Sequence, residues 1–202
     1  MQTNIRTGTE RLSQVNPLYT LSGISALLYV VVSLAAIALT DWNNPAAVST
    51  PAMVLGVLGF VAMLPVVVAV YQHLRPASTA LSSVAVICGV LALTGAAIGT
   101  VVGYDSTLGI VSGLLGSFGM LLFFGLSGYL ALRSSLLPSG WAYLSILLGM
   151  LAGAAGVISG TATSSSDLAS LAWTSFNVAT LVWALWTAVE LIRRGRTASA
   201  GA

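Results

Sequence analysis

The sequence predicts an all-α polytopic membrane protein with six transmembrane helices. Hydrophobic residues make up 57% of the 202 residues and charged residues only 6%, against about 25% charged in a soluble domain. The charged residues fall between six apolar segments, each close to the roughly 20 residues that cross a bilayer as a helix. So few charges could not cover the surface of a soluble fold, and we therefore expect a membrane domain.

The first apolar segment, 18–40, follows a polar N-terminal tail, 1–17, that we predict to be cytoplasmic. Ala36-Ile37-Ala38 has the small-x-small form of a signal-peptide cleavage site. The segment is longer than the apolar core of a typical signal peptide, however, and further membrane segments follow it. We therefore expect it to be retained as the first helix.

The second apolar segment, 52–71, begins after the turn signal Asp41-Trp-Asn-Asn-Pro45 and ends at the polar residues 72–76. Pro65 lies inside it and removes one backbone donor. Membrane helices tolerate this when neighbouring helices satisfy the freed carbonyl, so we predict a kinked helix. The third segment covers 79–102.

The last three apolar segments cover 108–132, 141–160 and 168–191. None contains a charged residue in its first 20 positions, and the polar loop 133–140 joins the first two of them. We predict a single membrane domain over 18–192, followed by a cytoplasmic tail over 193–202.

Arginines and aspartates occupy alternate connections between the spans, and this predicts the orientation of the chain. The arginines fall on one side of the six spans and the loop aspartates on the other. By the positive-inside rule the arginine side is cytoplasmic, so both the N and the C terminus lie inside. We expect a multi-pass protein of the cytoplasmic membrane of a bacterium. The arginines are Arg6, Arg11, Arg75, Arg133, Arg193, Arg194 and Arg196, and the aspartates are Asp41, Asp105 and Asp167.

Aromatic residues gather near the predicted ends of the spans. Such rings anchor a helix at the level of the lipid headgroups, which is the role we predict for them. Near the cytoplasmic side lie Tyr19, Tyr71, Tyr129, Trp141, Tyr143 and Trp186, and near the outer side Trp42, Tyr104 and Trp173.

Glycines recur every three or four residues in the third, fourth and fifth segments, so each set lines one helix face. In lipid, close backbone approach over small residues provides the van der Waals contact between helices. We expect these three helices to form the tight centre of the bundle; the alternative is that the same faces pair two copies of the chain. The predicted packing residues are Gly95, Gly99, Gly103, Gly109, Gly113, Gly149, Gly153 and Gly156.

The composition argues against several chemistries. The absence of lysine excludes a retinal Schiff base, and a single histidine excludes haem held between two imidazoles. The carboxylates all lie near span ends, and Cys88 is the one cysteine, so we predict no metal site, no cofactor and no enzymatic activity. The scattered arginines form no basic patch for nucleic acid.

Five residues remain as candidate binding residues. His73 could ligate a haem or pigment axially or titrate as a switch, although a histidine at a membrane interface needs no such role. Tyr29 and Asn177 are the most unusual polar residues within the spans, at matching depths of about 14 to 16 Å. With Ser33 and Thr174 on the same helix faces, they either join the first helix to the last or line a small outward-facing cavity.

The segment Gly128 to Ala142 resembles the loop between helices four and five in a widespread group of six-helix bacterial membrane proteins of unknown function. In that group an arginine, a leucine pair and a proline occupy the positions of Arg133, Leu136-Leu137 and Pro138. The resemblance implies the same six-helix fold and no particular site.

Three functional classes fit these observations. Glycine-lined helices and the scarcity of charge favour an accessory or assembly subunit, whose partners would be membrane lipids and other membrane proteins or a second copy of the chain. A carrier or binding protein for a small molecule or lipid would use the Pro65 kink and the pair Tyr29 and Asn177. A pigment- or haem-binding subunit would use His73.

Overall fold

The computed structural model describes residues 17–39, 49–103, 106–161 and 167–200, which form helices with short connections. Every helix is long and apolar enough to cross a membrane, and no strand occurs among the described residues. The predicted fold class, a six-helix polytopic membrane protein, is confirmed. The helices are α1 (Pro17–Ala38), α2 (Thr50–Leu74), α3 (Thr79–Val102), α4 (Thr107–Ser134), α5 (Ser139–Thr161) and α6 (Asp167–Ala200).

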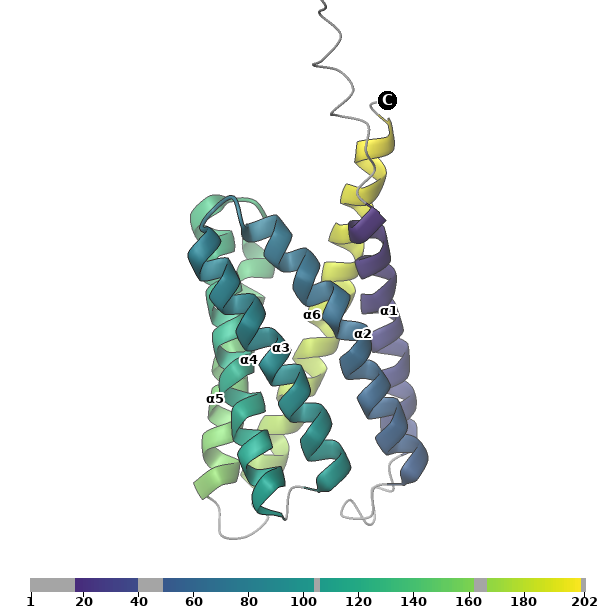
Figure 1. The fold of residues 1–202 in the computed structure, drawn as a ribbon, viewed down its shortest axis with the longest axis vertical. Coiled ribbons are helices and arrows are strands. Elements are labelled where there is room, and N and C mark those ends of the chain that lie inside the picture. The colour runs from purple at the N-terminus through teal and green to yellow at the C-terminus, as the bar shows by residue number, and fades with distance from the viewer. Residues whose placement is uncertain (1–16, 40–48, 104–105, 162–166, 201–202) are drawn as a thin grey trace, which may run out of the picture.

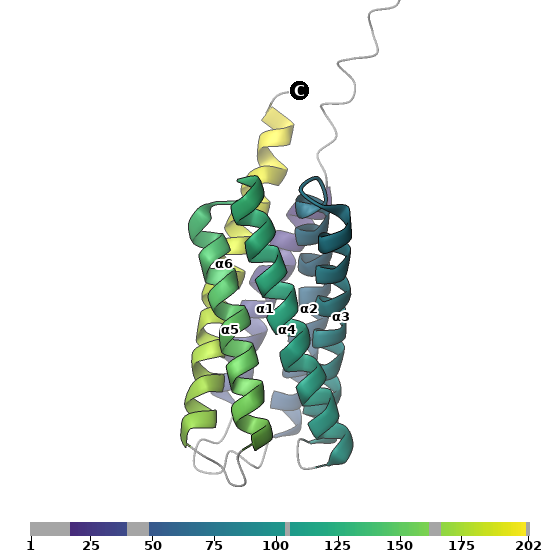
Figure 2. The same ribbon diagram turned by 90° about the vertical axis from the view of Figure 1, so that its left-hand side faces the viewer.

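The six helices form a closed ring, shown from two sides in Figures 1 and 2. Each helix contacts the next one in the chain, α6 contacts α1, and α2 reaches across to α4. The ring therefore closes through its first and last helices. The predicted C-terminal tail, 193–202, continues α6 as a helix to Ala200, which extends beyond the other helices (Figure 2).

The described arginines lie at one end of the bundle, which we call the arginine end. This end contains the start of α1, the α2–α3 and α4–α5 connections and the C-terminal part of α6 (Figure 1). Asp167 begins α6 at the opposite end. The separation of arginines from aspartates thus holds among the described residues, with Glu190 as an acidic residue at the arginine end. The cytoplasmic location of this end stays a prediction. Arg6, Arg11, Asp41 and Asp105 lie outside the described residues.

Local sequence explains where several helices begin and end. Ser49, Ser78 and Ser106 cap α2, α3 and α4, because each hydroxyl accepts a hydrogen bond from a backbone N–H of the first turn. Gly103 ends α3 with a φ of 81°, a conformation that favours glycine. Ser135 ends α4 in the left-handed region with a φ of 54°, which turns the chain sharply into the α4–α5 connection.

The helix α2 continues through Pro65, as membrane helices can when neighbours satisfy the backbone. The Pro65 carbonyl accepts a hydrogen bond of 2.9 Å from the hydroxyl of Ser22 on α1. This contact ties α1 to α2 at the proline.

Several glycines lie where two helix backbones nearly touch. A Cβ built on Gly95 would lie 2.6 Å from the Ser112 carbonyl oxygen, and one on Gly149 would lie 2.9 Å from the Leu121 carbonyl oxygen. Gly119 and Gly128, which were not among the predicted packing residues, approach α3 and α5 equally closely. Any larger residue at these positions would push α3, α4 or α5 apart.

The other predicted packing glycines occupy varied surroundings. Gly153 faces the flexible side chain of Leu121 and Gly156 faces the Ser117 side chain, while no atom lies within 4 Å of a Cβ built on Gly103. Gly99 and Gly109 are buried.

Aromatic rings fill the space between α4, α5 and α6. Trp173 packs edge-to-face on Phe176, Phe176 on Phe124, and Phe124 on Trp183, with ring centroids 5.0 to 6.4 Å apart. Trp183 then packs against Trp141 near the arginine end, at 5.5 Å. We call these five rings the aromatic column. The aromatic column is continuous with the hydrophobic core.

Candidate functional site

A cavity of about 540 Å³ lies in the half of the bundle away from the arginine end. This volume falls within the roughly 300 to 1,000 Å³ typical of small-molecule sites. Every helix except α1 contributes to its wall. The lining residues are Phe60, Ala96, Ile110, Gly113, Leu114, Gly116, Ser117, Met120, Gly156, Ser159, Trp173, Phe176 and Asn177.

The cavity wall is mainly apolar, and none of its lining residues carries a charge. Two of its polar groups are already hydrogen-bonded within the protein. The Ser117 hydroxyl donates to the Gly113 carbonyl at 2.9 Å, and the Trp173 indole donates to the Ser159 hydroxyl oxygen at 2.8 Å. Phe176, the second ring of the aromatic column, lines the cavity, so the column borders it.

Asn177 differs from the other polar residues of the wall. No hydrogen bond to its side-chain amide occurs within the described part of the chain. The residue lies ten positions into α6, about 15 Å from its start at 1.5 Å per residue. An amide at that depth is costly without a partner, because hydrocarbon offers none. The cavity is the place from which a bound molecule or water could supply one.

The predicted partners of Asn177 lie elsewhere. Tyr29 interacts with Ser33 one turn further along α1. A Cβ built on Gly59 of α2 would lie 3.5 Å from the Tyr29 ring and 3.6 Å from the Ser33 hydroxyl oxygen, so this stripe faces α2. No hydrogen bond joins Tyr29 to Asn177 within the described ranges, and Thr174 is exposed and does not line the cavity.

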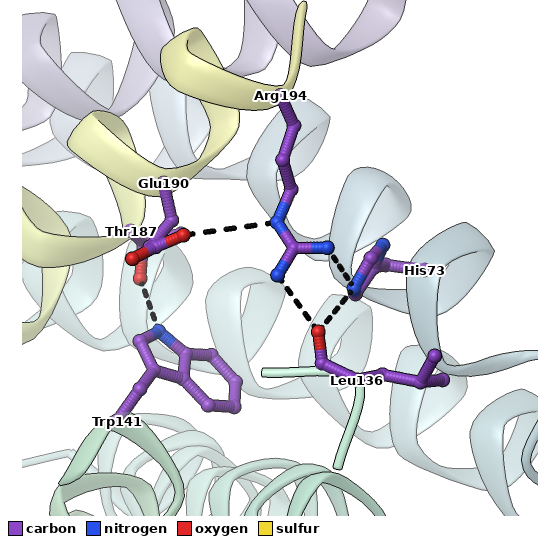
Figure 3. Close-up of polar contacts among 6 residues, drawn as sticks. All are labelled: His73, Leu136, Trp141, Thr187, Glu190 and Arg194. Atoms are coloured by element: carbon purple, nitrogen blue, oxygen red, sulfur yellow. Dashed lines mark hydrogen bonds and ion pairs between the residues drawn. The ribbon is translucent and has the colours of Figure 1, made fainter. Parts of the chain in front are cut away.

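A second polar site lies at the arginine end, where His73 of α2 meets Arg194 of α6 (Figure 3). The Arg194 guanidinium lies 2.9 Å from His73 Nε2 through Nη1 and donates through Nη2 to the Leu136 carbonyl oxygen at 2.7 Å. His73 Nε2 also lies 3.0 Å from that oxygen. Glu190, one helical turn before Arg194 on α6, forms an ion pair with the same guanidinium at 3.7 Å. We call these four residues the polar cluster.

The contacts of His73 Nε2 depend on which ring nitrogen carries the hydrogen. Arginine has only donors, so the 2.9 Å contact with Nη1 is a hydrogen bond when Nε2 is the acceptor, whereas the 3.0 Å contact with Leu136 is one when Nε2 is the donor. In the neutral tautomer with its hydrogen on Nδ1, Nε2 accepts from Nη1 and the Leu136 carbonyl oxygen accepts from Nη2. His73 thus completes a two-pronged contact of Arg194 that spans three segments of the bundle.

This arrangement bears on the proposal that His73 is an axial ligand. The lone pair of Nε2 faces Arg194, and the neighbouring void that the described residues enclose, lined by Trp141, Thr187 and Glu190 among others, measures about 10 Å³. A void of this size holds about one water molecule. A haem or pigment bound through Nε2 would have to displace the guanidinium.

Trp141 corrects one expectation from the sequence. It was predicted to anchor at the headgroups, but it is only 1% exposed and its indole donates to the buried Thr187 hydroxyl at 2.8 Å. Burial is favourable here because the indole N–H has a partner inside the bundle. Tyr143 and Tyr129 are exposed, as anchoring rings would be. The sequence contains one weak sign of this contact: Thr187 lies four residues after Trp183 and therefore on the same face of α6.

Comparison with known protein families, with characterised proteins and with solved structures finds no match to this chain. The resemblance of residues 128–142 to a six-helix group therefore stays an expectation. Within the described ranges, no group of three metal-ligating side chains comes together.

Proposed function

We propose that the protein is an integral membrane protein that binds a neutral, mainly apolar molecule, a lipid or a compound of similar character, in the 540 Å³ cavity. The single observation that carries the proposal is Asn177. Asn177 is exposed, lies about halfway along a membrane span and lines the cavity, and its amide lacks a hydrogen-bond partner within the described residues. A ligand with one hydrogen-bonding group and an apolar body would satisfy both the amide and the wall.

The residues of the cavity wall also support an uncharged ligand that is bound without being chemically converted. A charged ligand buried here would have no counter-ion among the lining residues, which is costly in a medium of low dielectric constant. The two serines of the wall are engaged with Gly113 and Trp173, and no base lies among the lining residues to activate them. We therefore propose binding or carriage of the molecule rather than its chemical conversion.

The location follows from the predicted orientation. With the arginine end in the cytoplasm of a bacterium, the cavity lies in the outer half of the cytoplasmic membrane. The ligand would then enter from the outer leaflet or the outer surface. An accessory role with other membrane proteins, or with a second copy of the chain, is compatible with such binding and stays a prediction.

Fluorescence quenching tests the proposal directly. A long-chain alcohol brominated at its far end provides one hydroxyl for Asn177 and a bromine that quenches nearby indoles. Titrated into the protein in lipid nanodiscs, it should quench Trp173 emission saturably, above the linear quenching that the alcohol causes by partitioning into lipid. Trp173→Phe should remove the saturable part. Quenching that stays linear for the native protein would overturn the proposal.

Matched variants separate the amide from its surroundings. Asn177→Leu should raise the alcohol concentration that gives half-maximal saturable quenching by about tenfold, because one hydrogen bond worth about 1 kcal/mol or slightly more is lost. Val178→Leu, at the exposed neighbouring position, should leave it unchanged. Gly113→Phe, which fills the cavity, should abolish it, whereas Val111→Phe on the exposed face of α4 should not. Equal effects of Gly113→Phe and Val111→Phe would contradict a site in the cavity.

A further inference from the structure

We propose that His73 is a proton-operated latch, which holds the arginine end of the bundle closed while its imidazole is neutral and releases it when the imidazole is protonated. The inference rests on the geometry of the polar cluster in Figure 3 and is independent of the ligand in the cavity.

The latch joins three segments that are far apart in sequence. His73 lies in the last turn of α2, Arg194 lies near the end of α6, and Leu136 lies in the α4–α5 connection. Contacts between the guanidinium and the other two hold these segments together. Ser135 supports the arrangement, because its left-handed conformation directly precedes the carbonyl that Arg194 binds.

Protonation would remove the acceptor on which this contact depends. A protonated imidazole carries hydrogens on both nitrogens, so Nε2 would face the Arg194 Nη1 donor with a donor of its own. Two positive charges would then lie within about one hydrogen-bond length, in a half-buried site where screening is weak. The neutral imidazole favours the closed contact, and the charged one opposes it.

The groups around His73 provide an alternative partner for the released guanidinium. From α6 come Arg194 and Glu190, from α1 comes the Tyr19 ring, edge-on at 6.1 Å, and from the α4–α5 connection comes the Leu136 carbonyl. Glu190 is one helical turn from Arg194 and already touches it at 3.7 Å. When His73 repels Arg194, the guanidinium can close onto Glu190, and the protonated imidazole can donate to Leu136. His73 and Glu190 are therefore two partners between which the guanidinium can shift.

The expected consequence is a looser α4–α5 connection. In the closed state Arg194 Nη2 donates to the Leu136 carbonyl oxygen at 2.7 Å, and its departure removes the hydrogen bond that ties this connection to α6. Leu137, 9% exposed and packed beside His73 and Trp141, would then become accessible. The proton thus controls the closure of the arginine end.

Nitrogen NMR of the imidazole tests the closed state. His73 is the sole histidine of the chain, so its ring signals need no assignment. At about pH 8, above the ordinary titration range of histidine, Nδ1 should carry the hydrogen and Nε2 should show the shift of a hydrogen-bonded acceptor. Arg194→Gln should move the Nε2 signal toward that of a free acceptor. A hydrogen on Nε2 in the native protein would overturn the latch.

Thiol accessibility tests the release. In a Cys88→Ala background, Leu137→Cys reports the buried position and Ser135→Cys the exposed one. The ratio of their rates with dithiodipyridine, a reagent that also reacts in acid, should rise at least about fivefold between about pH 8 and about pH 5, as expected when a hydrogen bond is lost. The midpoint should match the imidazole titration seen by NMR.

His73→Gln is the matched control, because its side-chain carbonyl still accepts from Arg194 but does not titrate. Its rate ratio should stay low and independent of pH. Arg194→Lys, which keeps the charge and loses the fork, should give a high ratio already at about pH 8. A pH-dependent rise that persists in His73→Gln, or a flat ratio in the native protein, would overturn the proposal.

Discussion

The indole of Trp141 on α5 and the hydroxyl of Thr187 on α6 form a buried hydrogen bond of 2.8 Å. A parallel contact follows one turn deeper, where the Trp183 indole donates to the Ser145 hydroxyl at 2.8 Å. Each helix thus donates one indole hydrogen bond to a hydroxyl of the other. These bonds fix the rotation of α5 against α6 and so position the aromatic column, because edge-to-face packing alone permits many angles.

Replacing Thr187 by valine keeps the shape of the side chain but removes the hydroxyl. The variant should destabilise the bundle, because the Trp141 N–H would stay buried without an acceptor. Hydrogen bonds within membrane proteins average about 0.6 kcal/mol and reach about 1.7 kcal/mol. We expect a loss of about 0.5 to 1.7 kcal/mol in the free energy of unfolding, measured by equilibrium unfolding in mixed detergent micelles.

Thr187→Ser is the control, since it keeps the acceptor and loses one methyl group. Combining Thr187→Val with Trp141→Phe should be non-additive, because both remove the same bond. Additive losses would show that the bond contributes nothing beyond packing.

Gly149 packs on the backbone of Gly125 across the α4–α5 contact, but the two glycines should respond oppositely to alanine. A Cβ on Gly149 would lie 2.9 Å from the Leu121 carbonyl oxygen and 3.1 Å from the Gly125 nitrogen, whereas a Cβ on Gly125 would meet no atom within 4 Å. Gly149→Ala should therefore cost about 1 to 3 kcal/mol, as overpacking does. Gly125→Ala should be neutral or stabilise by up to about 1 kcal/mol, because alanine favours the helix.

Thermal unfolding of the two alanine variants in detergent would measure this difference. Equal melting temperatures would mean that α4 and α5 are further apart in the membrane than their backbone contact indicates.

Single cysteines in a Cys88→Ala background should establish the orientation. Thr107→Cys, exposed at the start of α4, should react with an impermeant maleimide added to intact cells. Ser135→Cys, exposed at the arginine end, should react only after the membrane is permeabilised, because the arginine end is predicted to be cytoplasmic. The reverse pattern would place the arginines outside.

The spans could be predicted from sequence because hydropathy and turn residues report directly on helices in lipid. The predicted second span, 52–71, lies within α2 (Thr50–Leu74), which is longer because Ser49 caps its start and its last turn leaves the apolar stretch. Helix length beyond the hydrocarbon layer leaves no mark in hydropathy. The same holds for α6, which continues as a helix past the predicted boundary at 192.

The contacts of the candidate sites were harder to predict, for two physical reasons. A helix that faces lipid on one side and protein on the other is apolar all round, so sequence does not reveal which face is buried. Tyr29 and Asn177 were recognised by their rarity, but the partner of each depends on helix rotation. His73 and Arg194 are 121 residues apart, and their contact depends on the turn at Ser135, which no short pattern encodes.

The rotation of α1 leads to a prediction for Tyr29 and Asn177. Matching depth suggested a shared hydrogen bond, but Tyr29 packs with Ser33 against Gly59 of α2, and Asn177 lines the cavity on α6. Residues without a shared partner contribute additively to within about 0.3 to 0.5 kcal/mol. Tyr29→Phe and Asn177→Leu should therefore add in the double variant.

The two single variants should also differ in their effect on the free energy of unfolding. Tyr29→Phe removes a hydroxyl that interacts with Ser33 and should cost about 0.6 kcal/mol, the average for such bonds in membrane proteins. Asn177→Leu removes an amide without a partner within the described residues, so in empty protein it should leave stability unchanged or raise it. Equilibrium unfolding in delipidated detergent measures both. A coupling energy above about 1 kcal/mol would instead mean that a bound molecule or water bridges the two side chains through the bundle.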